Sequence, residues 1–360
     1  MTENIEQLSR SIYYQLIDLF EVSAIYSHNN KLIYKVRPKS DNSGARQLIE
    51  ERLKKSGFEI KYTEYFDDAL IEVSQSSRKK LPRLHIILFI ATLISIFLAP
   101  FFSSGLIFEP NAVYTYLSQP EFFMDRLEFT IALIAILLFH EFGHYFTGRK
   151  RGVLMSLPYF LPAPNIAGTF GAIIKSRSPI LNRRDLIEVG SAGPIAGFVI
   201  SVIALVIGLQ NSQIVETGLL SGLSLGDSLL LKFLTWLIVG PIPDGYDIAL
   251  SPASFAGWVG LLVTMLNLLP MGQLDGGHIV YGLFGRAQHI IGKIFAVIMI
   301  ALGFYWPGWW IFGIMIFIFK LKHPPTIDDE IPIPFHARLM GFVAIAIFAV
   351  SFIPIPFDFA

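Results

Sequence analysis

Residues 133–144 read Leu-Ile-Ala-Ile-Leu-Leu-Phe-His-Glu-Phe-Gly-His, so His140, Glu141 and His144 directly follow an apolar run. On a helix, residues four apart lie on the same face, and both imidazoles can therefore reach one metal ion. Glu141 would lie beside that metal, where it could take a proton from water. Because ionisable groups are costly inside an apolar span, we expect a metal centre here rather than a chance match.

The composition around this stretch is that of a membrane protein. The chain has 360 residues, of which 53% are apolar and only 16% are charged, and its formal net charge is zero. Nothing in this charge balance suggests a nucleic-acid partner. The chain has no Cys, which excludes disulfides and thiolate metal ligands. We expect an integral protein of a lipid bilayer, placed in the cell membrane.

Seven apolar runs are candidates for bilayer spans, each of which needs about 20 apolar residues. The fifth and sixth are short and meet at a Trp-Pro turn. The expected fold is an α-helical polytopic membrane protein with about seven transmembrane helices. The seven runs are residues 84–102, 127–147, 187–209, 253–269, 290–305, 308–319 and 337–354.

The placement of Lys and Arg predicts the orientation. If every span crosses, the basic segments fall on one side, whereas the loop 103–125 carries Glu109, Glu121 and Asp125. By the positive-inside rule, the N-terminal domain is then cytoplasmic and the C-terminus lies outside. The basic segments are residues 78–83, 149–151, 175–184, 286–293 and 320–322.

The polar N-terminus predicts a separate domain. Residues 1–76 are expected to form a cytoplasmic α/β accessory domain, and residues 84–360 the transmembrane domain that carries the metal motif. Apolar spacing and turn residues in the first segment predict its elements. They are helices over 7–20 and 45–56, a hairpin of 23–27 with 31–36, and strands over 58–65 and 69–74.

Two apolar segments are unlike ordinary spans. Residues 152–174 contain Pro158, Pro162 and Pro164, so they cannot form a continuous helix. Irregular backbone at membrane depth must be buried in protein or line a wet cavity, and we expect a membrane-embedded β-like re-entrant element. Residues 219–239 are amphipathic and are expected on the outer surface. A cluster of Trp306, Trp309 and Trp310 is interpreted as an interfacial belt.

A third metal ligand is expected within residues 267–278, Asn-Leu-Leu-Pro-Met-Gly-Gln-Leu-Asp-Gly-Gly-His. Catalytic zinc takes three protein ligands and keeps an open position. The stretch follows the fourth span, which ends at the depth of His140 and His144. Asp275 is our candidate, and His278 is the competing one. The alternative interpretation of Asp275 is a turn residue in an Asp-Gly dipeptide.

Together these motifs resemble the site-2 protease family of intramembrane zinc metalloproteases. The resemblance covers residues 84–360 and is carried by the two motifs in order, with Asn267 and Pro270 matching an Asn-x-x-Pro lead-in. Residues 168–172 and 192–197 look especially like the archaeal and chloroplast branch, and the PDZ domain usual in the family is not evident. The resemblance implies that His140, His144 and Asp275 bind Zn²⁺ and that Glu141 is the general base. It also implies hydrolysis of transmembrane protein substrates in regulated intramembrane proteolysis.

Substrate contacts are expected at two places. Gly168, Phe170 and Gly171 lie in a stretch that could offer an edge strand to an unwound substrate, or could be a purely structural loop. Asn267 could hydrogen-bond the substrate backbone or an oxyanion, or could cap a helix. The alternative class is a metal transporter or a metal-sensing membrane protein; a transporter would more often show internal repeats, and none is apparent. A non-proteolytic, protease-like chaperone is disfavoured because Glu141 and the ligand set are intact.

Overall fold

The computed structural model describes residues 2–28, 31–39, 43–65, 68–75, 83–104, 106, 109–153, 155–176, 180, 182–217, 223–319, 323–326, 329 and 331–359. The turn at Asn29-Asn30 and the basic residues 78–80, 320 and 322 lie outside this description. The chain divides into two compact units. The first comprises Met1–Pro82, Tyr145–Leu157 and Ile174–Leu181, and the second comprises Arg83–His144, Pro158–Ile173 and Asn182–Ala360.

The N-terminal part of the first unit is a four-stranded antiparallel sheet with two helices. The strand order is β1-β2-β4-β3, and one core joins residues of both helices to residues of all four strands. Leu32, Tyr34 and Val36 alternate inward along β2, and Ile49 and Leu53 face them from one side of α2. The elements are α1 (Thr2–Leu16), β1 (Phe20–His28), β2 (Lys31–Pro38), α2 (Ser43–Lys55), β3 (Phe58–Tyr65) and β4 (Asp68–Gln75).

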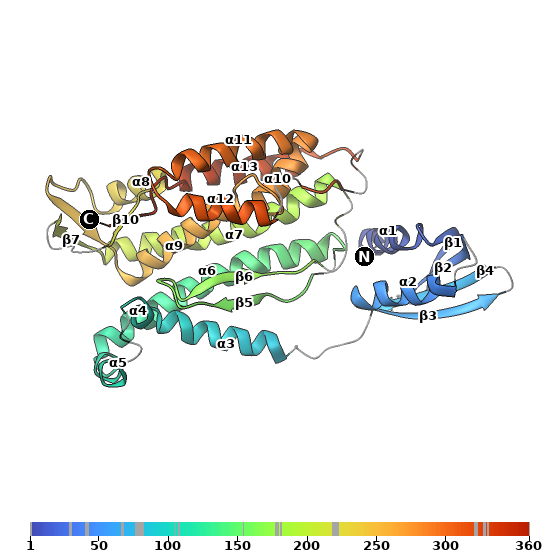
Figure 1. The fold of residues 1–360 in the computed structure, drawn as a ribbon, viewed down its shortest axis with the longest axis horizontal. Coiled ribbons are helices and arrows are strands. Elements are labelled where there is room, and N and C mark those ends of the chain that lie inside the picture. Colours follow the sequence, from blue (N-terminus) through green and yellow to red (C-terminus); the bar gives the residue numbers. More distant parts are fainter. Residues whose placement is uncertain are drawn as a thin grey trace. The chain divides into compact units, whose positions relative to one another are not determined.

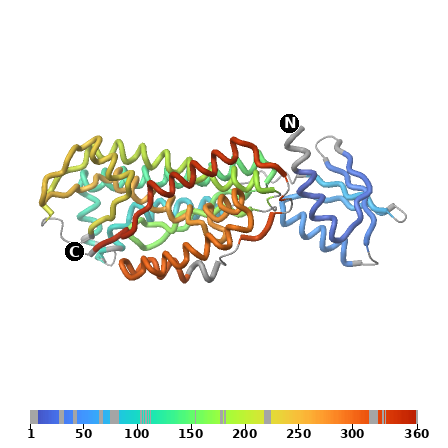
Figure 2. Tube along the Cα trace, turned by 90° about the horizontal axis from the view of Figure 1, so that it is seen from above, coloured from blue at the N-terminus to red at the C-terminus, as the bar shows by residue number. Residues whose placement is uncertain are grey.

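The second unit is mostly helical, as predicted. Helix α7 (Arg183–Gln210) is its centre and packs against α8, α9, α10 and α13 (Figure 1 and Figure 2). The other helices are α3 (Arg83–Phe97), α4 (Ala99–Ser103), α5 (Pro110–Leu117), α6 (Pro120–Lys150, whose last turns belong to the first unit), α8 (Leu229–Ile238), α9 (Pro252–Asn267), α10 (Asp275–Phe284), α11 (Gln288–Leu302), α12 (Gly308–Phe319) and α13 (Phe335–Ser351).

Three short antiparallel strand pairs accompany these helices. The segment 152–174, expected to be non-helical, contains the pair of β5 (Tyr159–Pro162) and β6 (Thr169–Ile173), which packs against α3. The C-terminal residues are held in place because β10 (Phe357–Phe359) pairs with β8 (Leu223–Leu225). The third pair joins β7 (Gln213–Glu216) to β9 (Tyr246–Ala249).

Two helices in the described residues are long and apolar enough to cross a bilayer, Arg183–Gln210 and Asp275–Leu302. Four apolar helices are shorter, so the predicted number of seven spans is not confirmed. The run 290–305, predicted as a separate span, is the later part of the apolar segment that begins at Asp275. Helix α10 and a 3₁₀ turn, Gly285–Ala287, lead directly into α11.

Two smaller predictions differ from the structure. The amphipathic surface helix begins at Leu229 rather than at 219, because residues 223–225 form a strand and 218–222 lie outside the description. The interfacial-belt interpretation is wrong for Trp309. This side chain is fully buried, and its indole N–H donates to the Pro354 carbonyl over 2.6 Å.

Candidate metal centre

Helix α6 positions the two histidines of the first motif. His140 and His144 lie one helical turn apart, so their side chains leave the same face, and they are only 5% and 9% exposed. The apolar residues that precede them hold this stretch in the core, where Leu133 and Leu137 are also buried. The sequence pattern thus produces a helix that carries two buried imidazoles.

Asp275 is brought to this face by a tight loop between α9 and α10. Gly272 adopts a φ of +57°, a conformation that favours glycine. A Cβ on Gly276 would lie 2.0 Å from the Leu268 carbonyl oxygen, and one on Gly277 would lie 2.4 Å from the Gly272 carbonyl oxygen. The glycines therefore let the first turn of α10 fold back onto the loop, which places Asp275 at the helix start.

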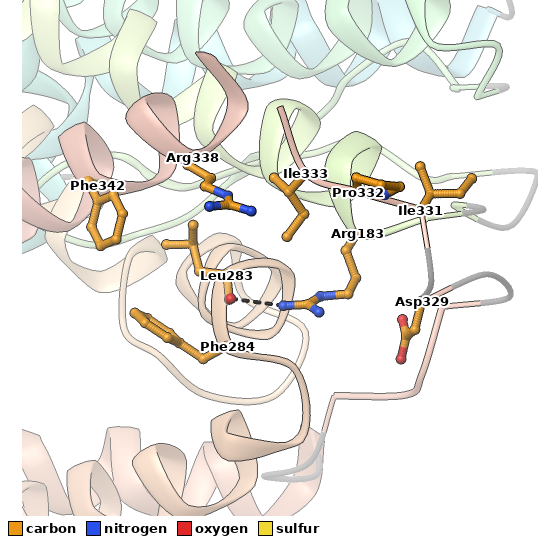
Figure 3. Close-up of a pocket in the computed structure, with 9 residues that line it drawn as sticks. All are labelled: Arg183, Leu283, Phe284, Asp329, Ile331, Pro332, Ile333, Arg338 and Phe342. Atoms are coloured by element: carbon orange, nitrogen blue, oxygen red, sulfur yellow. Dashed lines mark hydrogen bonds between the residues drawn. The ribbon is translucent and has the colours of Figure 1, made fainter. Parts of the chain in front are cut away.

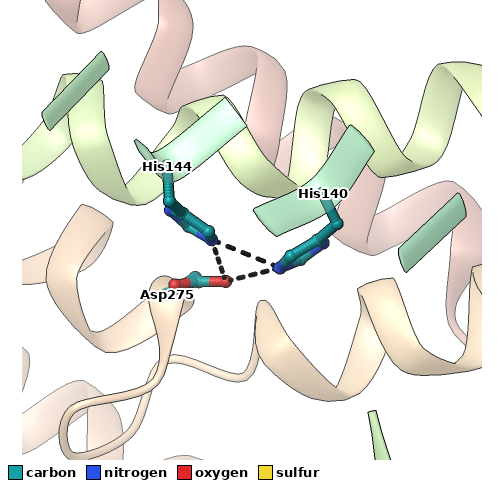
Figure 4. A group of neighbouring side chains, drawn as sticks. All are labelled: His140, His144 and Asp275. Carbon is teal, nitrogen blue, oxygen red and sulfur yellow. Dashed lines mark hydrogen bonds and ion pairs between the residues drawn. The ribbon is translucent and has the colours of Figure 1, made fainter. Parts of the chain in front are cut away.

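The side chains of His140, His144 and Asp275 converge on one point (Figure 4). Asp275 Oδ2 lies 3.4 Å from His140 Nε2 and 3.2 Å from His144 Nε2, and the two Nε2 atoms are 3.2 Å apart. Tetrahedral zinc with ligands at about 2.0–2.1 Å would place its donor atoms about 3.3–3.4 Å apart. The three atoms thus have the spacing of three corners of a zinc coordination sphere.

The hydrogen bonds around the imidazoles favour a metal at the same point. His144 Nδ1–H can donate to the Val189 carbonyl oxygen at 2.8 Å, which leaves the lone pair of Nε2 free for a metal. The Asn267 amide nitrogen lies 3.4 Å from His140 Nε2. Three acceptor atoms at these short separations need a cation or protons between them, and two nitrogens with one carboxylate oxygen are normal zinc donors.

Helix α7 supplies the surface on which both imidazoles rest. A Cβ on Gly193 would lie only 2.0 Å from His144 Nε2, and one on Gly197 would lie 3.1 Å from His140 Nδ1. Small residues such as those at 192–197 are typical of helix-packing surfaces. The structure shows that two glycines of this stretch make room for the metal-centre histidines. The spacing of small residues in the sequence indicates close helix packing. It does not show which side chains pack against the glycines, because tertiary packing determines that.

His278, the competing candidate, is turned toward another partner. Its Nδ1 lies 2.6 Å from Nε2 of His323, a residue far along the chain, and the His323 ring stacks on Tyr281. Among the described residues, the cluster of metal-binding atoms contains Asp275 and not His278. Glu141 follows His140 on α6 and is 5% exposed. It is therefore enclosed with the cluster rather than on the protein surface.

The expected substrate residues lie at the β5–β6 hairpin and at the end of α9. Gly168 and Gly171 have φ values of +75° and +93°, and a Cβ on Gly168 would lie 2.4 Å from the Ile96 Cα. Phe170 between them is 74% exposed. Among the described strands, β6 pairs with β5 alone, so its other edge carries no strand partner. Asn267, by contrast, lies directly at the histidine cluster.

Comparison with known proteins identifies this region. Residues 128–306 match peptidase family M50. The chain is 30% identical to a protein described as probable zinc metalloprotease EGY2, chloroplastic, of Arabidopsis thaliana over 66% of this chain and 44% of the relative. It is 31% identical to the Oryza sativa subsp. indica EGY2 over 70% of this chain and 46% of the relative.

The Arabidopsis protein described as probable zinc metalloprotease EGY1, chloroplastic, is 32% identical over 54% of this chain and 36% of its own length. The chain thus spans less than half the length of these curated relatives. No solved structure matches the chain. Residues 128–306 are thus a domain of peptidase family M50, the site-2 protease family, and the chain is a homologue of the EGY zinc metalloproteases.

Proposed function

We propose that this chain is a zinc-dependent intramembrane endopeptidase that hydrolyses peptide bonds of membrane-spanning protein substrates. The observation that carries the proposal is the convergence of His140, His144 and Asp275 with donor atoms 3.2–3.4 Å apart. The relatives are named zinc metalloproteases, and the region that matches peptidase family M50 contains these three residues. Because the chain covers less than half of those relatives, its activity and substrates are part of this proposal.

Each residue of the centre has a distinct role in the proposed reaction. His140, His144 and Asp275 would hold Zn²⁺, which supplies a Lewis acid that activates water and polarises the scissile carbonyl. The Glu141 carboxylate would accept a proton from the attacking water and pass it to the nitrogen of the leaving amine. The burial of Glu141 supports this role, because a buried base keeps its proton exchange with the substrate separate from bulk solvent.

Two further groups would position the substrate. The Asn267 amide, 3.4 Å from His140 Nε2, would donate a hydrogen bond to the carbonyl oxygen undergoing attack. The exposed edge of β6, with Gly168, Phe170 and Gly171, would pair with an unwound substrate segment. Strand pairing would satisfy the backbone hydrogen-bonding groups of that segment. It would also hold the segment extended, whereas the substrate is helical before it unwinds.

We propose that about seven helices of the segment 84–360 cross a membrane and that residues 1–76 form a separate cytoplasmic domain. Large apolar side chains are exposed on the outer faces of the second unit, where lipid would cover them. The distribution of basic segments supports a cytoplasmic N-terminal domain, and the membrane we propose is the cell membrane. Exposed apolar side chains include Ile90, Ile131, Ile203, Ile294 and Leu339.

The Glu141→Gln variant tests the enzymatic proposal. Zinc content, measured by elemental analysis of the purified chain, should stay near that of the wild type because Glu141 is not among the three clustered ligands. Cleavage of a generic membrane-spanning substrate should be abolished. Cleavage that persists in this variant would reject Glu141 as the base. Zinc binding without cleavage by the wild type would instead favour a non-proteolytic role.

The absence of Cys makes the membrane topology testable with single-Cys variants. Glu64 lies in the N-terminal domain and Gln213 lies in β7, and both are exposed. In intact cells, a membrane-impermeant maleimide should label Gln213→Cys and spare Glu64→Cys. Labelling of both or of Glu64→Cys alone would contradict the proposed orientation.

A further inference from the structure

A cavity of about 390 Å³ lies where the ends of three helices meet in the second unit. Arg183 opens α7, Leu283 and Phe284 end α10, and Arg338 lies in the first turn of α13. The segment before α13 closes the remaining side, as Figure 3 shows. The cavity is separate from the metal centre, and its volume suits a small ligand group. Its lining is completed by Asp329, Ile331, Pro332, Ile333 and Phe342.

The polar part of the cavity is positively charged. Arg183 is fixed in place because its Nε and Nη2 donate to the carbonyl oxygens of Gly282 and Leu283, both at 2.8 Å. In the part of the chain that the structure describes, no carboxylate forms an ion pair with Arg183 or Arg338. The single lining carboxylate, Asp329, already accepts hydrogen bonds from the Tyr281 and Thr326 hydroxyls.

The helix ends add to this charge. The N-termini of α7 and α13 both lie at the cavity, and each has the partial positive charge of a helix start. Two guanidinium groups beside two helix N-termini repel one another unless an anion lies between them. Arginine also binds phosphate oxygens with two parallel hydrogen bonds. The cavity therefore favours a phosphate-type anion.

The wall of the cavity continues into an exposed apolar surface. Phe284 and Phe342 form its rim, with ring centroids 6.4 Å apart, and they are 45% and 51% exposed. Beyond the rim, Leu339 and Val343 continue the apolar face of α13 away from the helix start. A ligand that fits the whole site thus has an anionic end beside the arginines and long apolar chains along α13.

We propose that this cavity binds the phosphate headgroup of an anionic phospholipid, with the acyl chains lying along α13. The proposal rests on the membrane placement proposed above. It does not require zinc or proteolysis. Basic pockets between membrane helices on the cytoplasmic side commonly receive such headgroups. Because Arg183 also donates to the carbonyl oxygens at the end of α10, the bound lipid would lie beside a residue that fixes this helix end.

The test counts the lipids bound to the full-length chain by native mass spectrometry, in zwitterionic detergent, during titration with phosphatidylglycerol. The wild type should retain one phosphatidylglycerol and bind phosphatidylcholine much more weakly. Arg338→Gln should weaken phosphatidylglycerol binding roughly tenfold, as expected for loss of one charge-assisted contact. Lys293→Gln removes an equal charge from an exposed position on α11 outside the cavity and should bind like the wild type.

Further controls make the result decisive. Arg338→Lys keeps the charge but loses the paired geometry, so it should fall between wild type and Arg338→Gln. Elution volume and zinc content should be unchanged in all variants, which separates this test from the test of the protease. Displacement of the lipid by millimolar inorganic phosphate would indicate a free-anion site and overturn the proposal. The proposal would also be overturned if Arg338→Gln and Lys293→Gln weakened phosphatidylglycerol binding equally. Retention of phosphatidylcholine by the wild type to the same extent as phosphatidylglycerol would overturn it as well.

Discussion

Replacement of Gly193 by Ala should disrupt the metal centre from a helix that contributes no ligand. The new Cβ would lie 2.0 Å from His144 Nε2, whereas ordinary contact begins at 3.4 Å. The imidazole would therefore have to move by about 1.4 Å, or α6 and α7 would have to separate. Zinc sites tolerate ligand displacements of only about 0.2 Å. We therefore expect zinc affinity to fall by roughly 100-fold or more, beyond the usual effect of an outer-shell change.

Two matched substitutions separate this effect from general destabilisation. Gly197→Ala places a Cβ 3.1 Å from His140, so shifts of a few tenths of an ångström suffice and the loss should be smaller. Gly313→Ala, in the middle of α12, meets no atom within 4 Å and should leave zinc unchanged. Ala is a better helix former than Gly by about 1 kcal/mol, so none of these variants should weaken its own helix intrinsically.

The assay is zinc per chain, measured by elemental analysis after exposure to graded chelator concentrations, together with cleavage of a membrane-spanning substrate. The expected order of zinc retention is Gly313→Ala, then Gly197→Ala, then Gly193→Ala. If Gly193→Ala retained zinc and activity like Gly313→Ala, the contact between α7 and the His144 ring would not constrain the site, and the reasoning from this geometry would be refuted.

The remaining predictions concern the third ligand and the N-terminal domain. Asp275→Asn should lose zinc in elemental analysis while His278→Ala keeps it, because Asp275 lies at the imidazoles; the opposite result would make His278 the ligand. A hydrogen bond from Lys35 lowers the pKa of Asp68 below its ordinary value of 3.8, so this carboxylate stabilises the fold above that pH and ceases to do so as the pH falls. Pepsin should therefore digest the N-terminal domain of Asp68→Asn faster than that of wild type at roughly pH 5, and the difference should shrink as the pH falls below 3.8; equal rates at about pH 5 would contradict the linkage. Ile49→Ala should reduce the free energy of unfolding of the N-terminal domain by about 2–5 kcal/mol, measured by hydrogen exchange, without changing zinc content; a parallel loss of zinc would show that the two units do not fold independently.

The parts of the structure that follow from local sequence were predictable. The four-residue spacing of His140 and His144 needs only a helix, and the apolar run before them predicts that helix. The alternating residues of β2 similarly predict a sheet with one buried face, and the mostly helical character of the segment 84–360 is confirmed. These features depend on periodicity within a dozen residues, which the sequence contains directly.

Features that depend on tertiary contacts were missed. Gly276 and Gly277 ordinarily disfavour a helix, yet at the start of α10 their lack of side chains lets the first turn pack on the preceding loop. His278 was considered as a ligand because sequence proximity cannot show that a histidine 45 positions away meets its ring. Trp309 was placed at an interface because the aromatic cluster does not reveal which ring packs inward.

The metal centre and the packing of the helical unit depend on the same residues. His144 is held by the Val189 carbonyl and lies against Gly193, so α7 fixes the orientation of a ring that belongs to α6. Asp275 reaches that ring only because glycines let α10 fold back on its loop. Three buried ionisable groups would oppose this packing if each were alone, since isolated charges in an apolar interior are costly. A cation held between the three side chains would turn that cost into a stabilising contact, so the helices that form the core would also form the proposed catalytic site.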